Sequence, residues 1–177
     1  MANVKVRYFR ESEELYTPGL SYATTGSIGL DLRACFDQAT AALAPGQRLA
    51  VPSGLAIEVQ APEIQVPKEQ SPKEYSPEGQ VPDEHFTAMG GFIYSRSGLG
   101  ATKGLTVAQG VGVIDPDYRG EIIVYLLNTS QSEIVINRGD RVAQLIFQPV
   151  ARLTPVKVES LTDTERGAGG FGHTGKN

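Results

Sequence analysis

Short runs of apolar residues alternate with Gly- and Pro-containing turns along the chain, and no stretch has the period of a long amphipathic helix. Such runs, bounded by turn residues, are typical of β-strands. A short helical turn is expected after Ser97. Many short strands separated by turns indicate an all-β fold, either a barrel or a jelly-roll-like sandwich. Strands are predicted for Val4–Tyr8, Leu49–Val51, Leu55–Val59, Gly91–Tyr94, Ile122–Leu127, Glu133–Ile136 and Arg141–Phe147.

Two of these strands are expected to differ in burial. Leu55–Val59 carries a charged residue, Glu58, between apolar ones, which favours a partly exposed strand. Ile122–Leu127 is apolar throughout. A continuous apolar run predicts a strand that is buried on both faces.

A pentapeptide repeat interrupts the strand pattern. Prolines recur at positions 62, 67, 72, 77 and 82, within five blocks from Ala61 to His85. Proline fixes φ and removes a ladder donor, so an internal strand is excluded here. We predict a solvated loop over residues 61–88 that either leans toward polyproline II or is disordered. It is either a surface expansion that costs little in loop closure or a docking site for an unknown partner at residues 61–85.

Composition narrows the classes of function. The chain has 177 residues, of which 40% are hydrophobic, and this is enough for one domain with a core of its own. Its net charge of −4 argues against nucleic-acid and membrane-surface binding. One cysteine permits no internal disulfide, and no signal peptide or membrane-length apolar run is present, so a cytoplasmic location is predicted. One cysteine and two histidines are too few ligands for a structural zinc site.

The C-terminal sequence Arg166-Gly-Ala-Gly-Gly-Phe-Gly-His-Thr-Gly175 combines five glycines with a cation and an aromatic ring. Arg166 offers a forked cation for phosphate, and Phe171 offers a flat face for a base. The segment alone fits equally a mobile arm that closes over a nucleotide and a frayed chain end. We divide the chain into a β-barrel domain at 1–160, interrupted at 61–88, and an arm at 161–177.

Four further segments carry chemistry. Gly26–Ala34 places one carboxylate after glycines, and Ser95–Gly100 places a cation and a hydroxyl beside glycines whose N–H groups can cradle an anion. Gly112–Gly120 holds two carboxylates and a tyrosine around a proline turn, and Arg138–Ile146 adds cations and a glutamine. Each is weak alone, and Asp115-Pro-Asp-Tyr would also fit an ordinary type I turn.

Taken together and in this order, the five segments resemble the five motifs of the trimeric deoxyuridine triphosphatases (dUTPases). The resemblance runs from about Ser21 to Gly175 and is interrupted by the repeat. Its most specific parts are Asp117-Tyr-Arg-Gly120 after Val-Ile-Asp, Arg141-Val-Ala-Gln-Leu-Ile146, and Arg166-Gly-Ala-Gly-Gly-Phe-Gly172. Ser95 stands where many members carry proline, which predicts a looser approach to the phosphate loop.

The resemblance implies a dUTPase-like β-clip barrel and a Mg²⁺-assisted attack of water on the α-phosphate of dUTP. The products would be dUMP, used for thymidylate synthesis, and pyrophosphate, and uracil would be kept out of DNA. It also implies a homotrimer whose three sites are each shared between subunits.

The family's roles carry over as follows. Asp115 matches the carboxylate that activates the water, and Asp31 matches the acid that holds Mg²⁺ through water. Tyr118 matches the residue that excludes a 2′-hydroxyl, while Arg166 and Phe171 match the residues that grip the γ-phosphate and stack on uracil. The implied substrate-binding residues are Arg96, Ser97, Gly98, Gln109, Val113, Ile114, Asp115, Tyr118, Ile123, Gln144, Arg166, Phe171 and Gly172.

Two alternatives stay open at the level of the sequence. One is a deoxycytidine triphosphate deaminase, which shares the barrel but moves protons at C4 of cytosine. The other is a nucleotide-sensing protein that docks a partner through the proline repeat.

Overall fold

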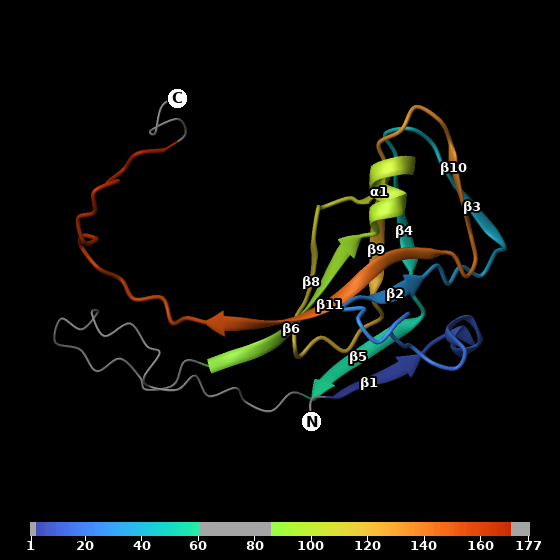
Figure 1. Cartoon of the computed structure of the whole chain (residues 1–177), viewed down its shortest axis with the longest axis horizontal. Coiled ribbons are helices and arrows are strands. Elements are labelled where there is room, and N and C mark those ends of the chain that lie inside the picture. Colours follow the sequence, from blue (N-terminus) through green and yellow to red (C-terminus); the bar gives the residue numbers. More distant parts are fainter. Residues whose placement is uncertain (1–2, 61–85, 171–177) are drawn as a thin grey trace.

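The computed structural model describes residues 3–60 and 86–170, and the strand pairings among them are all antiparallel. Figure 1 shows a barrel-like body from which a long two-stranded ribbon extends. The elements are β1 (Asn3–Tyr8), the 3-10 helix η1 (Ser12–Tyr16), β2 (Leu30–Arg33), β3 (Thr40–Leu43), β4 (Arg48–Pro52), β5 (Leu55–Gln60), β6 (Phe86–Ser95), α1 (Ser97–Lys103), β7 (Leu105–Val107), β8 (Gly112–Ile114), β9 (Ile123–Asn128), β10 (Ile134–Asn137) and β11 (Arg141–Arg152).

The described residues form four sheets. They have the strand orders β2-β11-β6-β8, β4-β9-β7, β1-β5 and β10-β3. Their inner faces meet in one apolar core, and each buried aliphatic side chain there contributes on the order of 1.5–3 kcal/mol relative to exposure. The largest fully buried apolar side chains are Leu32, Leu55, Ile122, Leu126, Ile136, Leu145, Val51, Val124 and Val142.

The ribbon consists of β6 and β11, which pair from Ala143↔Ser95 to Arg152↔Phe86. Its inner half belongs to the barrel, and its outer half carries the chain away from it (Figure 1). Residues 153–170 continue from β11 without a helix or strand. The ribbon therefore sets the direction in which the C-terminal segment leaves the body.

The structure confirms an all-β fold and every predicted strand, with ends that differ by a residue or two except in the ribbon. The prediction missed β2, β3, β7 and β8. Of these, β3 is alanine-rich, and β7 and β8 are only three residues long. These three strands therefore give little periodic signal. The helical turn expected after Ser97 is α1.

Two predictions need correction. Ile122–Leu127 is not buried on both faces, because Ile123 and Tyr125 are 38% and 51% exposed while their neighbours are buried. The outward face of this strand is therefore apolar, and in the single chain it is exposed. The loop predicted at 61–88 ends too late, since β6 begins at Phe86. The repeat itself, residues 61–85, lies outside the described residues.

In the described part of the chain, no helix is both long and apolar enough to cross a membrane.

Candidate active site

Three neighbouring strands bring together a group of polar side chains that we call the Asp31 cluster: Asp31, Arg96, Arg141 and Gln144. Asp31 lies on β2 directly opposite Gln144 on β11. Arg96 follows β6, the other neighbour of β11, and is the N-cap residue of α1. Strand register therefore places residues from three sequence motifs side by side.

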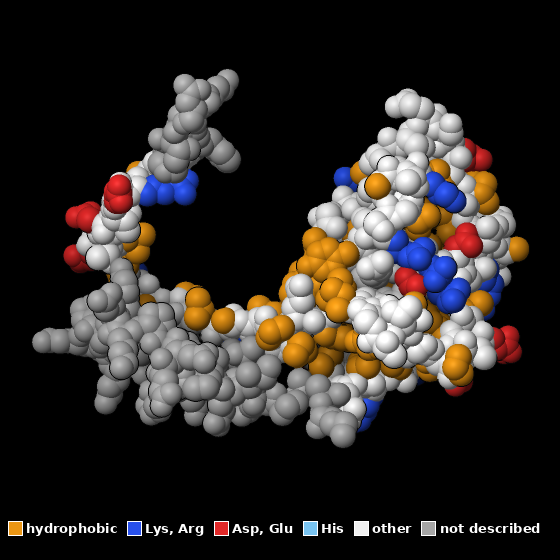
Figure 2. Space-filling view, viewed as in Figure 1, with side chains coloured by type: hydrophobic (Ala, Val, Ile, Leu, Met, Phe, Trp, Pro, Cys, Tyr) orange, Lys and Arg blue, Asp and Glu red, His pale blue; other side chains and the backbone are white. Residues whose placement is uncertain are grey.

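Both oxygens of the Asp31 carboxylate meet a guanidinium group. Arg96 Nε lies 2.9 Å from Oδ1, in an ion pair that lacks the alignment of a hydrogen bond, and Arg141 Nη1 donates to Oδ2 at 3.2 Å. Arg96 Nη1 also donates to the backbone carbonyl of Arg141 at 3.2 Å. The Asp31 side chain keeps 21% of its surface exposed. Figure 2 shows basic side chains gathered around acidic ones on the barrel beneath α1.

Gly29 leaves the space that Gln144 occupies. A Cβ added at Gly29 would lie 3.0 Å from Oε1 of Gln144. This is a closer approach than most side chains tolerate, so a glycine here lets the glutamine reach the cluster.

The first turn of α1 presents backbone donors next to Arg96. The amides of Leu99 and Gly100 bond to the Arg96 carbonyl at 3.1 and 2.8 Å. The first N–H groups of a helix have no acceptor within it, so those of Ser97 and Gly98 can serve a ligand. Both residues are exposed.

A second group of predicted residues lies on the loop after β8, which we call the hairpin loop (Asp115–Glu121). The amide of Tyr118 bonds to the Asp115 carbonyl at 3.1 Å, so the predicted turn is present. Asp115 is exposed, and its carboxylate has no hydrogen bond or ion pair with the residues that the structure describes. The hydroxyl of Tyr118 donates to the Glu121 carbonyl at 2.9 Å, and 43% of Tyr118 is exposed.

The other predicted residues of this group are also accessible. Gln109 is exposed, Val113 is 63% exposed and Ile123 is 38% exposed. A pocket of about 550 Å³ separates the hairpin loop from the ribbon. Its lining comprises Ala88, Gly90, Phe92, Val113, Ile114, Asp115, Pro116, Asp117, Val150 and Arg152.

The third group belongs to the C-terminal segment. Arg166 is exposed, and its Nε donates to the carbonyl of Gly169 at 3.0 Å, within the segment itself. Phe171 and Gly172 lie outside the described residues.

The single chain does not join these three groups. Within residues 3–60 and 86–170, no hydrogen bond or ion pair links the Asp31 cluster to Asp115, Tyr118 or Arg166. One chain thus holds a cluster of cations around a carboxylate, a free carboxylate beside a tyrosine, and a separate cation.

The comparisons with known proteins agree on one family. Residues 79–175 match the family model described as dUTPase. The chain is 38% identical over 172 residues to the deoxyuridine 5'-triphosphate nucleotidohydrolase of Desulfitobacterium hafniense, covering 97% of this chain and 95% of that protein. A relative of the same name from Acinetobacter baylyi is 38% identical over 173 residues, covering 98% and 97%.

The chain belongs to the dUTPase family. The prediction of the family is confirmed, and so is the prediction that the protein is an enzyme that hydrolyses dUTP. Neither the deaminase nor the sensing protein is favoured by these matches.

Solved dUTPases share the fold. The dUTPase of Staphylococcus bacteriophage 80alpha, solved with dUPNHPP, aligns with a TM-score of 0.71 and 18% identity over 98% of each chain. The dUTPase of Streptococcus mutans aligns with a TM-score of 0.58 and 21% identity, over 85% of this chain and 98% of that chain. These likenesses establish the dUTPase barrel as the architecture.

Among the described residues of this dUTPase family member, no group of three or more His, Cys, Asp or Glu side chains could hold a metal directly. Asp31 is a single, partly exposed carboxylate beside two arginines. Mg²⁺ keeps much of its hydration and is often bound by one carboxylate together with substrate phosphates. The donor set at Asp31 therefore fits a hydrated Mg²⁺ that accompanies a phosphate ligand.

Sequence reasoning missed two features of the site. Arg141 was not selected, although it lies in the fourth motif and bonds to Asp31. The second feature is the Ser95 hydroxyl, which accepts a hydrogen bond from the Val107 amide at 2.8 Å, while the looser approach stays a prediction. That bond joins the end of β6 to β7, and a proline could not make it.

Proposed function

We propose that the protein hydrolyses dUTP to dUMP and pyrophosphate, with Asp115 as the general base that deprotonates the attacking water. Water adds to the α-phosphorus, the bond to the bridging oxygen of the β-phosphate breaks, and pyrophosphate leaves with that oxygen. The observation that carries the proposal is the 38% identity to a deoxyuridine 5'-triphosphate nucleotidohydrolase over 97% of the chain. The exposed Asp115 carboxylate, which has no partner among the described residues, is free to hold a water molecule.

The Asp31 cluster would bind the triphosphate. Arg96, Gln144 and the amides of Ser97 and Gly98 supply donors for its oxygens. Asp31 would hold Mg²⁺ through water, and the ion would neutralise charge on the phosphates. Arg96 and Arg141 pair with Asp31 in the structure. When the triphosphate binds, they would pair with its more strongly charged oxygens instead.

The hairpin residues would select base and sugar. The backbone from Gln109 to Ile114 would meet the uracil edge, with Val113 and Ile123 beside it. Tyr118 would pack under the deoxyribose and leave no room for a 2′-hydroxyl. The exposure of these residues supports a surface that a ligand covers.

Arg166, Phe171 and Gly172 would close the site, with Arg166 on the γ-phosphate and Phe171 on uracil. Closure would exclude bulk water from the reacting groups. The exposed, self-bonded Arg166 of the single chain supports an arm that finds its ligand elsewhere.

We infer a homotrimer in which three chains complete each site. Among the described residues of one chain, no hydrogen bond or ion pair joins the three groups, which supports a site completed by other copies. Exposed apolar residues support this, among them Tyr125 on β9 and Val135 on β10. Figure 2 shows further apolar side chains at the surface beside the hairpin and along the ribbon.

The remaining predictions are kept as proposals. We assign residues 1–160 to the barrel domain with its insertion, residues 161–177 to the arm, and the protein to the cytoplasm, where its one cysteine, the buried Cys35, would stay reduced. A partner for residues 61–85 stays a prediction.

The test is pyrophosphate release from dUTP, dCTP, dTTP and UTP, each with and without Mg²⁺. We expect strong, Mg²⁺-dependent release from dUTP alone. Release of ammonia from dCTP would support the deaminase, and turnover of none would leave a nucleotide-binding protein.

A further inference from the structure

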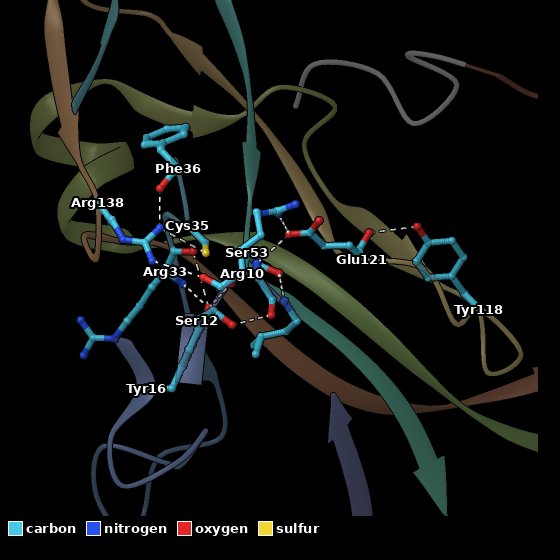
Figure 3. Close-up of polar contacts among 12 residues, drawn as sticks. Arg10, Ser12, Tyr16, Arg33, Cys35, Phe36, Ser53, Tyr118, Glu121 and Arg138 are labelled. Atoms are coloured by element: carbon cyan, nitrogen blue, oxygen red, sulfur yellow. Dashed lines mark hydrogen bonds and ion pairs between the residues drawn. The ribbon is translucent and has the colours of Figure 1, made fainter. Parts of the chain in front are cut away.

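Residues 9–25, which follow β1, include none of the residues assigned to the reaction. This N-terminal segment nevertheless contacts the hairpin loop. Figure 3 shows Arg10 from this segment beside Glu121, with Tyr118 on the far side of Glu121, and Ser12 of the same segment bonds to the Gly54 carbonyl. The chain of polar contacts thus runs from the N-terminal segment to the tyrosine that is assigned to sugar selection.

Glu121 is the centre of this chain of contacts. Its Oε1 accepts a hydrogen bond from the Gly54 amide at 2.8 Å and forms an ion pair with Nη2 of Arg10. Its side chain is only 16% exposed, so the pair is partly shielded from water. The hydrogen bond to Glu121 raises the pKa of Arg10. The carbonyl of the same Glu121 residue accepts the Tyr118 hydroxyl at 2.9 Å.

Arg10 is itself held in place. Arg10 and Glu11 have φ values of 50° and 54°, a conformation that non-glycine residues rarely adopt and that persists only where surrounding contacts enforce it. One such contact is the Arg138 Nη2 donor at 3.5 Å from the Arg10 carbonyl. The segment thus retains an unfavourable backbone at the residue that reaches Glu121.

Gly54 is fixed from the same side. The buried hydroxyl of Ser12 donates to the Gly54 carbonyl at 2.7 Å. Gly54 has φ of 73°, and an added Cβ would lie 2.3 Å from the Ser12 Cβ, so only glycine fits. One partner of the Glu121 carboxylate, Arg10, therefore belongs to the N-terminal segment, and the other, Gly54, is anchored by it.

We propose that Glu121 is a positioning residue, held by Arg10 and the Gly54 amide, that fixes the orientation of Tyr118 and thereby the choice of deoxyribose over ribose. The inference rests on the proposed role of Tyr118. Two anchors on the carboxylate restrict the main chain at residue 121, and the carbonyl there holds the tyrosine ring through its hydroxyl. Without the anchors the carbonyl can rotate, and the ring loses its fixed position.

The test compares Glu121→Gln and Arg10→Gln with wild type, Tyr118→Ala and Glu13→Gln. Glu13→Gln is the matched control, because Glu13 is an exposed carboxylate on η1 in the same segment. The readout is the ratio of kcat/KM for dUTP to that for UTP. We expect both test variants to lower this ratio about tenfold, the size of a modest change in pocket shape, and the control to leave it unchanged.

Hydrogen exchange of residues 115–121 provides a second readout that is independent of turnover. The Tyr118 amide, which bonds to the Asp115 carbonyl, should exchange faster in both test variants. An unchanged ratio with unchanged exchange would overturn the proposal, even if the melting temperature fell, because a merely structural role predicts that result. If Tyr118→Ala leaves the ratio unchanged, the sugar role of Tyr118 is wrong instead, and exchange alone then decides whether Glu121 holds the loop.

Discussion

The Asp31 cluster and the hairpin loop are built in different ways. The Asp31 cluster is assembled by strand register, with Asp31 opposite Gln144 and its carboxylate between Arg96 and Arg141. The hairpin loop has no ladder of its own. It is held by a turn and by contacts with the N-terminal half of the chain. The carboxylate of Asp115, the first residue of the loop, faces solvent.

The difference separates binding from chemistry. Charges in the Asp31 cluster are paired with each other, so the proposed phosphate ligand would exchange one set of ion pairs for another, and the cluster would give affinity. The Asp115 carboxylate has no partner among residues 3–60 and 86–170, so in the proposed role it would accept a proton. Substitution of Asp115 should therefore lower kcat, and substitutions in the Asp31 cluster should raise KM.

The largest effect is expected from Asp115→Asn. The amide cannot accept the proton of the attacking water, and general-base catalysis is worth on the order of 10³-fold. Single-turnover hydrolysis of dUTP should fall by that factor, while calorimetry shows nearly unchanged dUTP binding. Asp117→Asn, in the same turn, is the control and should retain activity. Near-normal turnover of Asp115→Asn would remove the base assignment.

Truncation before Arg166 should have the next largest effect. Among the described residues, none after Phe147 belongs to the barrel core or packs against it, so the shortened protein should fold and assemble as the full chain does. Loss of the closing cation and of substrate positioning should lower kcat/KM roughly 10²-fold. Circular dichroism and sedimentation check the fold and assembly. Full activity of the truncated protein would show that closure does not require the arm.

Arg96→Gln should raise KM more than it lowers kcat. A hydrogen bond from a charged donor is worth about 1.5–3 kcal/mol, which corresponds to roughly 10- to 100-fold in affinity. Arg48→Gln, an exposed arginine on β4, is the matched control. A fall in kcat at constant KM would contradict the division between the two regions, because it would place Arg96 in the chemical step.

The smallest effect concerns Glu58, which connects β5 to the hairpin loop. Lys5 Nζ lies 3.0 Å and Arg119 Nε 4.0 Å from its oxygens, and the Lys5 hydrogen bond lowers the pKa of Glu58 below its ordinary 4.5. A lowered folded-state pKa contributes stability that is present above the unfolded-state pKa and is lost as pH falls through the folded-state pKa. Lys5→Gln should therefore reduce the free energy of unfolding slightly at pH 7, and the difference should vanish in acid. Urea titrations at both pH values measure this, and an equal deficit at both would point to lost packing instead.

The sequence identified some of the site residues and missed others. The resemblance to the family's motifs selected Asp31, Arg96 and Gln144, and the structure places them together. It did not select Arg141 or Glu121, whose importance comes from partners distant along the chain: Arg141 with Asp31, and Glu121 with Arg10 and Gly54. A pattern of side-chain types carries no information about such pairs.

The sequence alone determined the all-β class, most strands and the family, because strand periodicity, turn residues and short motifs are local properties. Tertiary structure decided the rest. The long ribbon, the outward face of β9 and the grouping of site residues depend on which strands pair, and that is settled by long-range packing. Only in three dimensions does the chain separate its Asp31 cluster from its hairpin loop, since register brings three motifs together and leaves the other two apart.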